Sequence, residues 1–168
     1  MNNKLLPEEL HERIISFLKE HKQASLATCM NNIPRSSPVQ YFLGRETDIY
    51  IMSAGGEKFT AIQQNPNVCL LVNTEYINYR KIKGVQIFGR AETSDQVPEL
   101  LMEAREFSPE SYLLDSEAGK IKVIKIKPEE IVYLDSLETG DRTKQVLKGE
   151  ELQLKNEKEL ARRMASAL

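Results

Sequence analysis

Short apolar runs separated by turn residues recur along most of the chain. Runs rich in β-branched residues and bounded by Gly, Pro, Asn or Asp are typical of β-strands. The pattern predicts strands over residues 24–30, 35–43, 49–52, 68–72, 79–93, 121–126 and 130–135. Asn31-Asn32 lies between the first two runs, which predicts a β-hairpin at that point.

Apolar residues at helical spacing mark a helix over residues 7–21. Pro7 suits the first helical position, and one side of the segment is apolar through Leu10, Ile14, Phe17 and Leu18. His11 and His21 are expected on the polar side, without a functional role. A second helix of about two turns follows Gly55-Gly56 and must end at Asn65-Pro66, because proline cannot donate to the helical ladder.

A third helix is predicted to start near Pro98, capped by Asp95, and to end before Pro109. A further short turn of helix is expected at residues 112–114. Residues 150–168 have sparse apolar positions, so a frayed tail and a tail docked on a partner are both open. Helices inserted among six or seven strands, without strict alternation, favour an α+β fold that is mainly an antiparallel β-barrel. We expect one domain over residues 1–149 and a C-terminal tail over 150–168.

The segment from Ile49 to Val72 reads as a strand, a glycine bend, a short helix and a second strand. A helix N-terminus after a glycine bend presents unpaired N–H groups and partial positive charge, which suit a phosphate. Lys58 lies in the first helical turn and adds a full charge. The alternative is a plain turn followed by a solvated lysine.

Gly84 and Gly89 predict a bulge, a sharp bend or a close backbone approach within the long strand 79–93. Between them, Val85 and Ile87 share one face of the strand. Gln86 lies on the other face, and the pattern by itself predicts that it points outward from a half-exposed strand.

Composition excludes several classes of function. A net charge of −2 with no basic, aromatic-rich stripe argues against nucleic acid as a partner. No apolar run approaches the ~20 residues of a membrane span, and no signal peptide is evident, so we expect a cytoplasmic protein without a membrane partner. Cys29 and Cys69 lie in apolar runs and are expected to be buried thiols. With two histidines, both in the first helix, we predict no metal site and assign no catalytic residue.

The order of four motifs resembles the pyridoxamine 5′-phosphate oxidase-like family, the FMN-binding split β-barrels. The likeness covers about residues 10–135 and rests on segments 25–28, 33–39, 50–66 and 84–92. It implies a split antiparallel β-barrel with a few peripheral helices, a homodimer, and FMN held in a groove between subunits.

The resemblance also implies a set of cofactor-binding residues. The second hairpin strand would line the flavin, largely through backbone groups, and Lys58 would contact the FMN phosphate with Arg35 as a second cation. The complete set is Arg35, Ser36, Ser37, Pro38, Val39, Met52, Ser53, Lys58 and Gln86.

The chain departs from the oxidases proper in two places. Gly56 and Glu57 stand where those enzymes carry a Ser-Arg pair, and Glu57 is expected to repel a phosphate. The C-terminal Arg-x-His pair is absent, because no histidine follows His21. The resemblance therefore implies an oxidase-related member rather than an enzyme that acts on pyridoxamine phosphate.

These observations predict a flavoprotein that acts as an FMN-dependent oxidoreductase on a small molecule. The protein would supply binding, orientation and electrostatics to the flavin. The alternative is a module of the same fold that binds FMN or haem without turnover, or that serves only in protein interactions.

Overall fold

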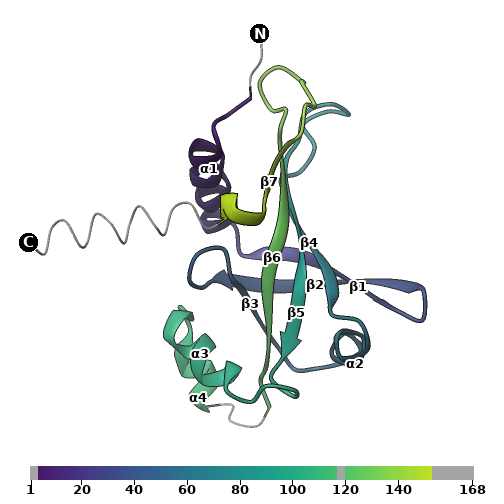
Figure 1. Ribbon diagram of the computed structural model, residues 1–168, viewed down its shortest axis with the longest axis vertical. Helices are drawn as coiled ribbons and strands as arrows, with labels where there is room; N and C mark the ends of the chain where they lie inside the picture. Colours follow the sequence, from purple (N-terminus) through teal and green to yellow (C-terminus); the bar gives the residue numbers. More distant parts are fainter. Residues whose placement is uncertain (1–3, 117–119, 153–168) are drawn as a thin grey trace, which may run out of the picture.

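The computed structural model describes residues 4–116 and 120–152. Within them, antiparallel strands follow the order β3-β2-β1-β4-β5-β6-β7, and β3 also pairs with β6 (Figure 1). The sheet therefore closes into a ring without forming a regular barrel, and the predicted split antiparallel β-barrel is confirmed. The strands are β1 Gln23–Met30, β2 Ile33–Leu43, β3 Ile49–Ser53, β4 Asn67–Asn73, β5 Lys83–Thr93, β6 Lys122–Asp135 and β7 Gln145–Lys148.

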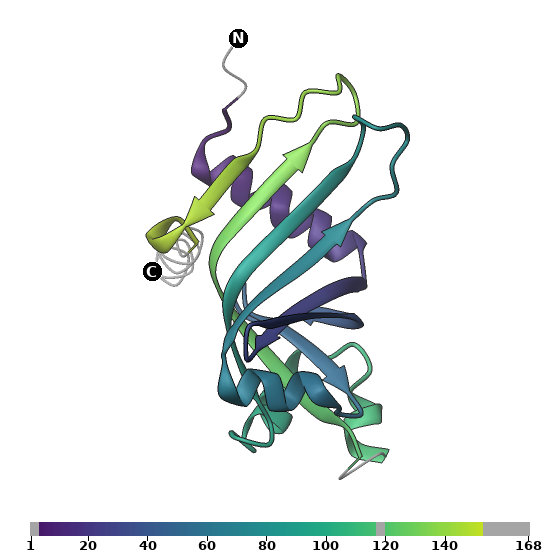
Figure 2. The same cartoon turned by 90° about the vertical axis from the view of Figure 1, so that its right-hand side faces the viewer.

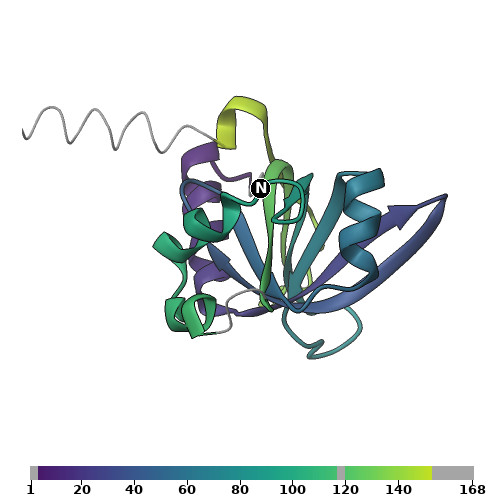
Figure 3. The same ribbon diagram turned by 90° about the horizontal axis from the view of Figure 1, so that it is seen from below.

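The helices lie around this ring. They are α1 Pro7–Glu20, α2 Glu57–Gln64, α3 Leu100–Phe107 and α4 Ser111–Ser116, with a 3-10 helix, η1, at Gly149–Leu152. Viewed from below, α2 and the β1–β2 hairpin lie on one side, and α3 and α4 lie on the other (Figure 3). Strands β4, β5 and β6 run side by side, and their connecting loops 74–82 and 136–144 project beyond one end (Figure 2).

The main core fills the ring because alternate strand residues point inward. In β4 the buried residues are Val68, Leu70 and Val72, and in β5 they are Val85, Ile87, Gly89, Ala91 and Thr93. The apolar face of α1 joins this core through Leu10, Ile14, Phe17 and Leu18. Alternation with period two therefore leaves a second, outward face on the same strands.

A smaller apolar cluster lies outside the ring, where α3 and α4 cover β3. Tyr50 is stacked between Phe42 and Phe107, with ring centroids 5.5 and 5.8 Å apart. The Tyr50 hydroxyl donates a hydrogen bond to Glu103, and Lys125 pairs with the same carboxylate. This cluster ties α3 to β3 and β6.

Charge interactions shift the pKa values within this cluster. The hydrogen bonds from Lys125 and Tyr50 lower the pKa of Glu103. Burial opposes the charge of Lys125, yet its contacts with Glu103 and with Asp48, 3.6 Å away, outweigh burial and raise the pKa of Lys125. Burial, reinforced by the Glu103 carboxylate, raises the pKa of Tyr50. Tyr50 therefore stays a neutral donor to a charged acceptor.

The structure corrects the predicted strands around residue 128. Residues 122–135 form one strand, β6, where two were predicted, because a bulge absorbs the irregular segment. Phe88 pairs with Glu130 and Gly89 with Pro128, so Glu129 is the extra residue. Of the alternatives predicted from the glycines, a close backbone approach is found at Gly89, which lies opposite the bulge in β6.

Other predicted elements also differ in detail. β5 begins at Lys83, because residues 79–82 belong to the preceding loop, and β7 was not predicted from its four residues. His11 is buried rather than on a polar face, because it packs on the inner side of α1. Asp95 does not cap α3; it pairs with Lys122 at 2.9 Å, and Glu99 takes the N-cap position.

The predicted domain boundary at residue 149 falls at η1, Gly149–Leu152. Leu152 is buried and belongs to the main core, so the packed region extends at least to this residue. The rest of the predicted tail, residues 153–168, lies outside the described residues. Among the described residues, no helix has the length and apolar character needed to cross a membrane.

Gly89→Ala should destabilise the protein, because a Cβ at this position would lie 2.3 Å from the backbone oxygen of Lys127. Overpacking of this kind typically costs about 1–3 kcal/mol. Urea denaturation would measure the loss, with the exposed neighbour Arg90→Ala as the control. Equal stability of the two variants would show that the bulge adapts without strain.

Glu103→Gln should lower stability at neutral pH by less than ~1 kcal/mol, as expected for a partly exposed ion pair. Because the folded-state pKa of Glu103 is lowered, its stabilisation is complete above the unfolded value of about 4.3 and is lost as the pH falls through the folded value. The stability difference between wild type and variant should therefore shrink on acidification. Denaturation at several pH values tests this, with Glu99→Gln at the N-cap of the same helix as control; a constant difference would contradict it.

Candidate functional site

The β1–β2 hairpin carries the polar groups of the candidate site on its inner face. Residues directly opposite in the two strands point to the same side, and the pairs are Ala24 with Val39, Leu26 with Ser37, and Thr28 with Arg35. Ala24, Val39 and Leu26 belong to the core. Further along the hairpin the same face becomes polar, as expected where it passes beyond the core.

The bend after β3 brings the N-terminus of α2 against this hairpin. Gly55 and Gly56 have φ values of +116° and +104°, which favour glycine. The Gly55 N–H donates to Oγ of Ser53 at 3.2 Å, which fixes the bend. The Nζ of Lys58 donates to the carbonyl of Gly55 at 3.1 Å, so the ammonium group lies beside the bend. The first N–H groups of a helix lack intrahelical acceptors and here lie at the same place.

These two elements enclose a cavity of about 370 Å³, which we call the hairpin cavity. Its lining residues are Thr28, Arg35, Ser36, Ser37, Glu57 and Lys58. Thr28 is only 4% exposed, so it lines the buried side of the cavity rather than open surface. The cavity therefore combines two cations, a carboxylate, the inward-facing Thr28 and Ser37 and a helix N-terminus, with Ser36 at its edge, a set suited to an anionic, oxygen-rich group.

One ion pair connects the two walls of the hairpin cavity. The guanidinium of Arg35, from β2, donates to the carboxylate of Glu57, from the first turn of α2. Their side chains are 43% and 66% exposed, so the pair lies at the cavity mouth in contact with solvent. The pair leaves Lys58 as the lining cation that is bonded to the backbone rather than to a carboxylate.

The structure brings together some of the residues predicted from the sequence. Arg35, Ser36, Ser37 and Lys58 all line the hairpin cavity, and Ser53 shapes the bend that positions α2. Thr28 and Glu57 complete the lining; neither was predicted as a ligand residue. The alternation of its strand indicates that Thr28 faces inward, since it follows the core residue Leu26 by two positions.

The remaining predicted residues lie elsewhere. The side chain of Val39 is in the main core. Met52 lies on the side covered by α3 and α4, where the Ser108 hydroxyl is 4.0 Å from its sulfur. Pro38 and Gln86 lie on the outward face of the sheet, because each alternates with inward residues of its strand. None of these four residues lines the hairpin cavity. A ligand in the cavity would reach them only through their backbone groups, or through a partner on the outward face.

The outward face carries two rows of residues that cross the sheet from β2 to β7. The outer row, which starts at the cavity residue Ser36, comprises Ser36, Ala27, Cys69, Phe88, Glu130 and Lys148. The second row comprises Pro38, Ser25, Leu71, Gln86, Val132 and Val146. Leu71, Phe88 and Val146 are 36%, 41% and 41% exposed, so three apolar side chains of this face are partly open to solvent among polar neighbours.

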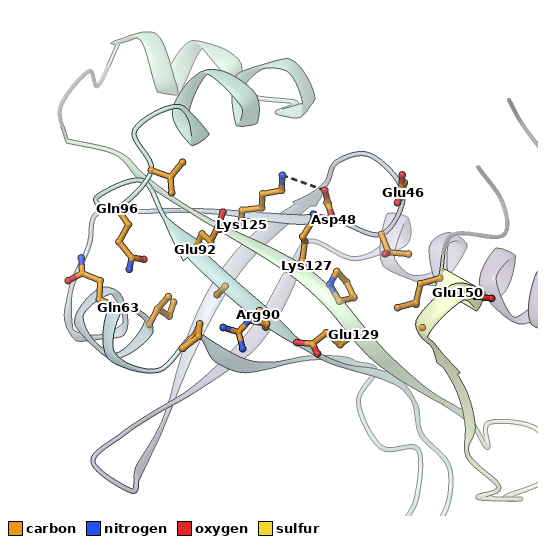
Figure 4. Close-up of a pocket in the computed structure, with 18 residues that line it drawn as sticks. Glu46, Asp48, Gln63, Arg90, Glu92, Gln96, Lys125, Lys127, Glu129 and Glu150 are labelled. Atoms are coloured by element: carbon orange, nitrogen blue, oxygen red, sulfur yellow. Dashed lines mark ion pairs between the residues drawn. The ribbon is translucent and has the colours of Figure 1, made fainter. Parts of the chain in front are cut away.

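A larger groove, of about 860 Å³, lies between α2, β5, β6 and η1 (Figure 4). Its side chains carry charges of both signs: Glu46, Asp48, Glu92, Glu129 and Glu150 against Arg90, Lys125 and Lys127. Lys125 points toward Asp48 and is paired with it. Burial raises the pKa of Asp48 although both lysines oppose the shift. Because carboxylates outnumber cations, the groove is less suited to an anionic ligand than the hairpin cavity.

A model of the family described as pyridoxamine 5′-phosphate oxidase matches residues 10–135, three quarters of the chain. The chain therefore belongs to the pyridoxamine 5′-phosphate oxidase family, and the relationship expected from its motifs is confirmed. None of the curated protein sequences matches it significantly.

Several solved structures share the fold. General stress protein 26 from Bacillus anthracis is 20% identical with a TM-score of 0.58, over 84% of this chain and 99% of that chain. A FAD-binding protein from Mesorhizobium loti is 20% identical with a TM-score of 0.57, over 71% and 90%. HutZ, the haem storage protein from Vibrio cholerae, is 16% identical with a TM-score of 0.55, over 70% and 89%. At these identities the similarity concerns the fold alone.

Proposed function

We propose that this member of the pyridoxamine 5′-phosphate oxidase family binds FMN and acts as a flavin-dependent oxidoreductase on a small molecule in the cytoplasm. The observation that carries the proposal is the hairpin cavity, in which Lys58, Arg35 and the N-terminus of α2 converge. Family membership makes a cofactor in this fold plausible, and the donors in the cavity favour one that bears a phosphate.

The cavity fits the phosphate end of FMN in charge and in hydrogen-bonding capacity. A phosphate monoester presents three strong acceptor oxygens and close to two negative charges. The ammonium of Lys58, the guanidinium of Arg35 and the hydroxyl of Thr28 are donors of three kinds lining one space. The free N–H groups of the helix terminus favour the same charge.

Haem fits the same cavity less well. Haem iron is held by His, Cys, Met or Tyr side chains, and the residues that line the hairpin cavity include none of these. Of the two histidines of the chain, His11 is buried in α1, and His21 follows the end of that helix with its Nδ1 2.8 Å from the carbonyl oxygen of Phe17. The donor set therefore supports a flavin phosphate over haem, although both kinds of cofactor occur among proteins of this fold.

FMN supplies hydride transfer when bound, so the protein's own task is to bind and orient it. In the proposed function Lys58 and Thr28 anchor the phosphate, and the backbone of β2 beside Ser36 and Pro38 guides the remainder of the molecule along the hairpin. We assign no side chain as an acid or base, since a positioned flavin does not require one.

A second copy of the chain would complete the site. The outer row leads from Ser36 on the cavity edge to the exposed ring of Phe88, so the cavity and this part of the outward face are neighbours. Apolar surface beside a ligand site is typical of a subunit interface. We therefore propose a homodimer in which the flavin lies near the interface and the second row, with Gln86, faces the partner.

Lys58→Ala should weaken FMN binding by roughly 10- to 150-fold, because a charge-assisted hydrogen bond to phosphate contributes about 1.5–3 kcal/mol. Quenching of flavin fluorescence on titration would measure the dissociation constant. The control is Lys120→Ala, which removes the same charge from an exposed lysine just before β6. Riboflavin, which lacks the phosphate, should bind both variants as it binds wild type; an FMN constant unchanged by Lys58→Ala would refute the proposed site.

Phe88→Glu should convert the dimer into a monomer, because it replaces an exposed aromatic ring of the proposed interface with a charge beside Glu130. Sedimentation velocity at micromolar concentration would report the change, and FMN binding should weaken with it. Met102→Glu is the matched control: Met102 is 75% exposed on α3, away from the outer row. A wild-type protein that sediments as a monomer would contradict the proposed interface.

A further inference from the structure

The carboxylate of Glu57 occupies a special position in the hairpin cavity. It lies in the first turn of α2, where the helix dipole favours an anion, and it accepts a hydrogen bond from Arg35 across the cavity mouth. These are two of the partners that the cavity offers to a phosphate. Glu57 thus already satisfies part of the anion-binding capacity of the site.

This arrangement rests on two separate elements of the fold. Arg35 is held on β2, paired with Thr28 of β1, while Glu57 follows the Gly55-Gly56 bend. The side chains reach each other at the mouth, whereas Thr28 lies inside. A phosphate that uses Thr28 and Lys58 would therefore come close to a guanidinium already bound to a carboxylate.

We propose that Glu57 is an internal competitor for the ligand phosphate: it holds Arg35 in the free protein and must release it when a phosphate monoester binds. The proposal rests on the proposed function of the same cavity. Its consequence is that the phosphate is bound less tightly than the cations alone would allow, so the flavin is exchangeable with the surrounding pool. Lys58 and Thr28 make the first contacts, and Arg35 joins after its pair with Glu57 opens.

The competition has a measurable signature that simple repulsion lacks. Removal of the Glu57 charge should strengthen binding through two effects: Arg35 is freed, and a negative charge beside the phosphate is lost. Only the first effect requires Arg35. A double-mutant cycle on Arg35 and Glu57 therefore separates release of the ion pair from repulsion through space.

The experiment compares FMN dissociation constants of wild type, Glu57→Gln, Arg35→Gln and the double variant by fluorescence quenching. Glu57→Gln should tighten FMN by at least about two- to fivefold, the range that an exposed ion pair supplies. In the Arg35→Gln background, Glu57→Gln should also increase FMN affinity, but by a factor about twofold or more smaller than in the wild-type background. Equal gains in both backgrounds would overturn the proposal, because repulsion alone would then account for them.

Two controls make the outcome specific. Glu99→Gln changes the net charge equally at the N-terminus of another helix, α3, and should leave FMN binding unchanged. Riboflavin affinity should not respond to Glu57→Gln, because riboflavin brings no phosphate to Arg35. If Glu57→Gln increased the affinity for riboflavin as much as that for FMN, the effect would come from a change in the shape of the site. That result would overturn the proposed competition.

Failure of this inference differs from failure of the proposed function. If Lys58→Ala weakens FMN while Glu57→Gln behaves like Glu99→Gln, the cavity binds phosphate and Glu57 does not compete. If neither wild type nor Glu57→Gln binds FMN, and inorganic phosphate produces no heat in calorimetric titration of either, the proposed function and the competition fail together.

Discussion

The pairing of β3 with β6 is the constraint on which the rest of the structure depends. Five residue pairs, from Ile49 with Ile126 to Ser53 with Lys122, close the sheet into a ring. Strand β6 can make this closure while pairing with β5 and β7 because it is long and bends at the bulge opposite Gly89. The closure also fixes where β3 ends. It therefore fixes the position of the glycine bend, from which α2 runs beside the β1–β2 hairpin.

The hairpin cavity is a consequence of that geometry rather than a separate feature. The hairpin is longer than the core it covers, so its inner face changes from Leu26 and Val39 to Ser37, Thr28 and Arg35 along its length. The N-terminus of α2 lies against the polar part. A site of this kind places charged groups on rigid elements at the rim of a core.

The hairpin cavity holds charges of both signs. Arg35 and Lys58 favour an anion, and Glu57 already forms an ion pair with Arg35. Surface ion pairs contribute little to folding stability, so the Arg35–Glu57 pair has more influence on what the cavity binds than on how firmly the chain folds. The outward rows, continuous with the cavity edge, offer the surface on which a second subunit would cover the ligand.

The sequence by itself determined the strand-rich fold, the hairpin, the glycine bend with Lys58, and the irregularity at Gly89, because these depend on local alternation and turn chemistry. It did not reveal that residues 122–135 form one strand, that His11 is buried, or that β7 exists, since these depend on partners distant in the chain. Arg35 and Lys58 were expected near one another through a family resemblance. Only the tertiary structure decided that Thr28 faces them from inside and that Glu57 binds Arg35, because 22 residues separate that pair and no local pattern encodes their contact.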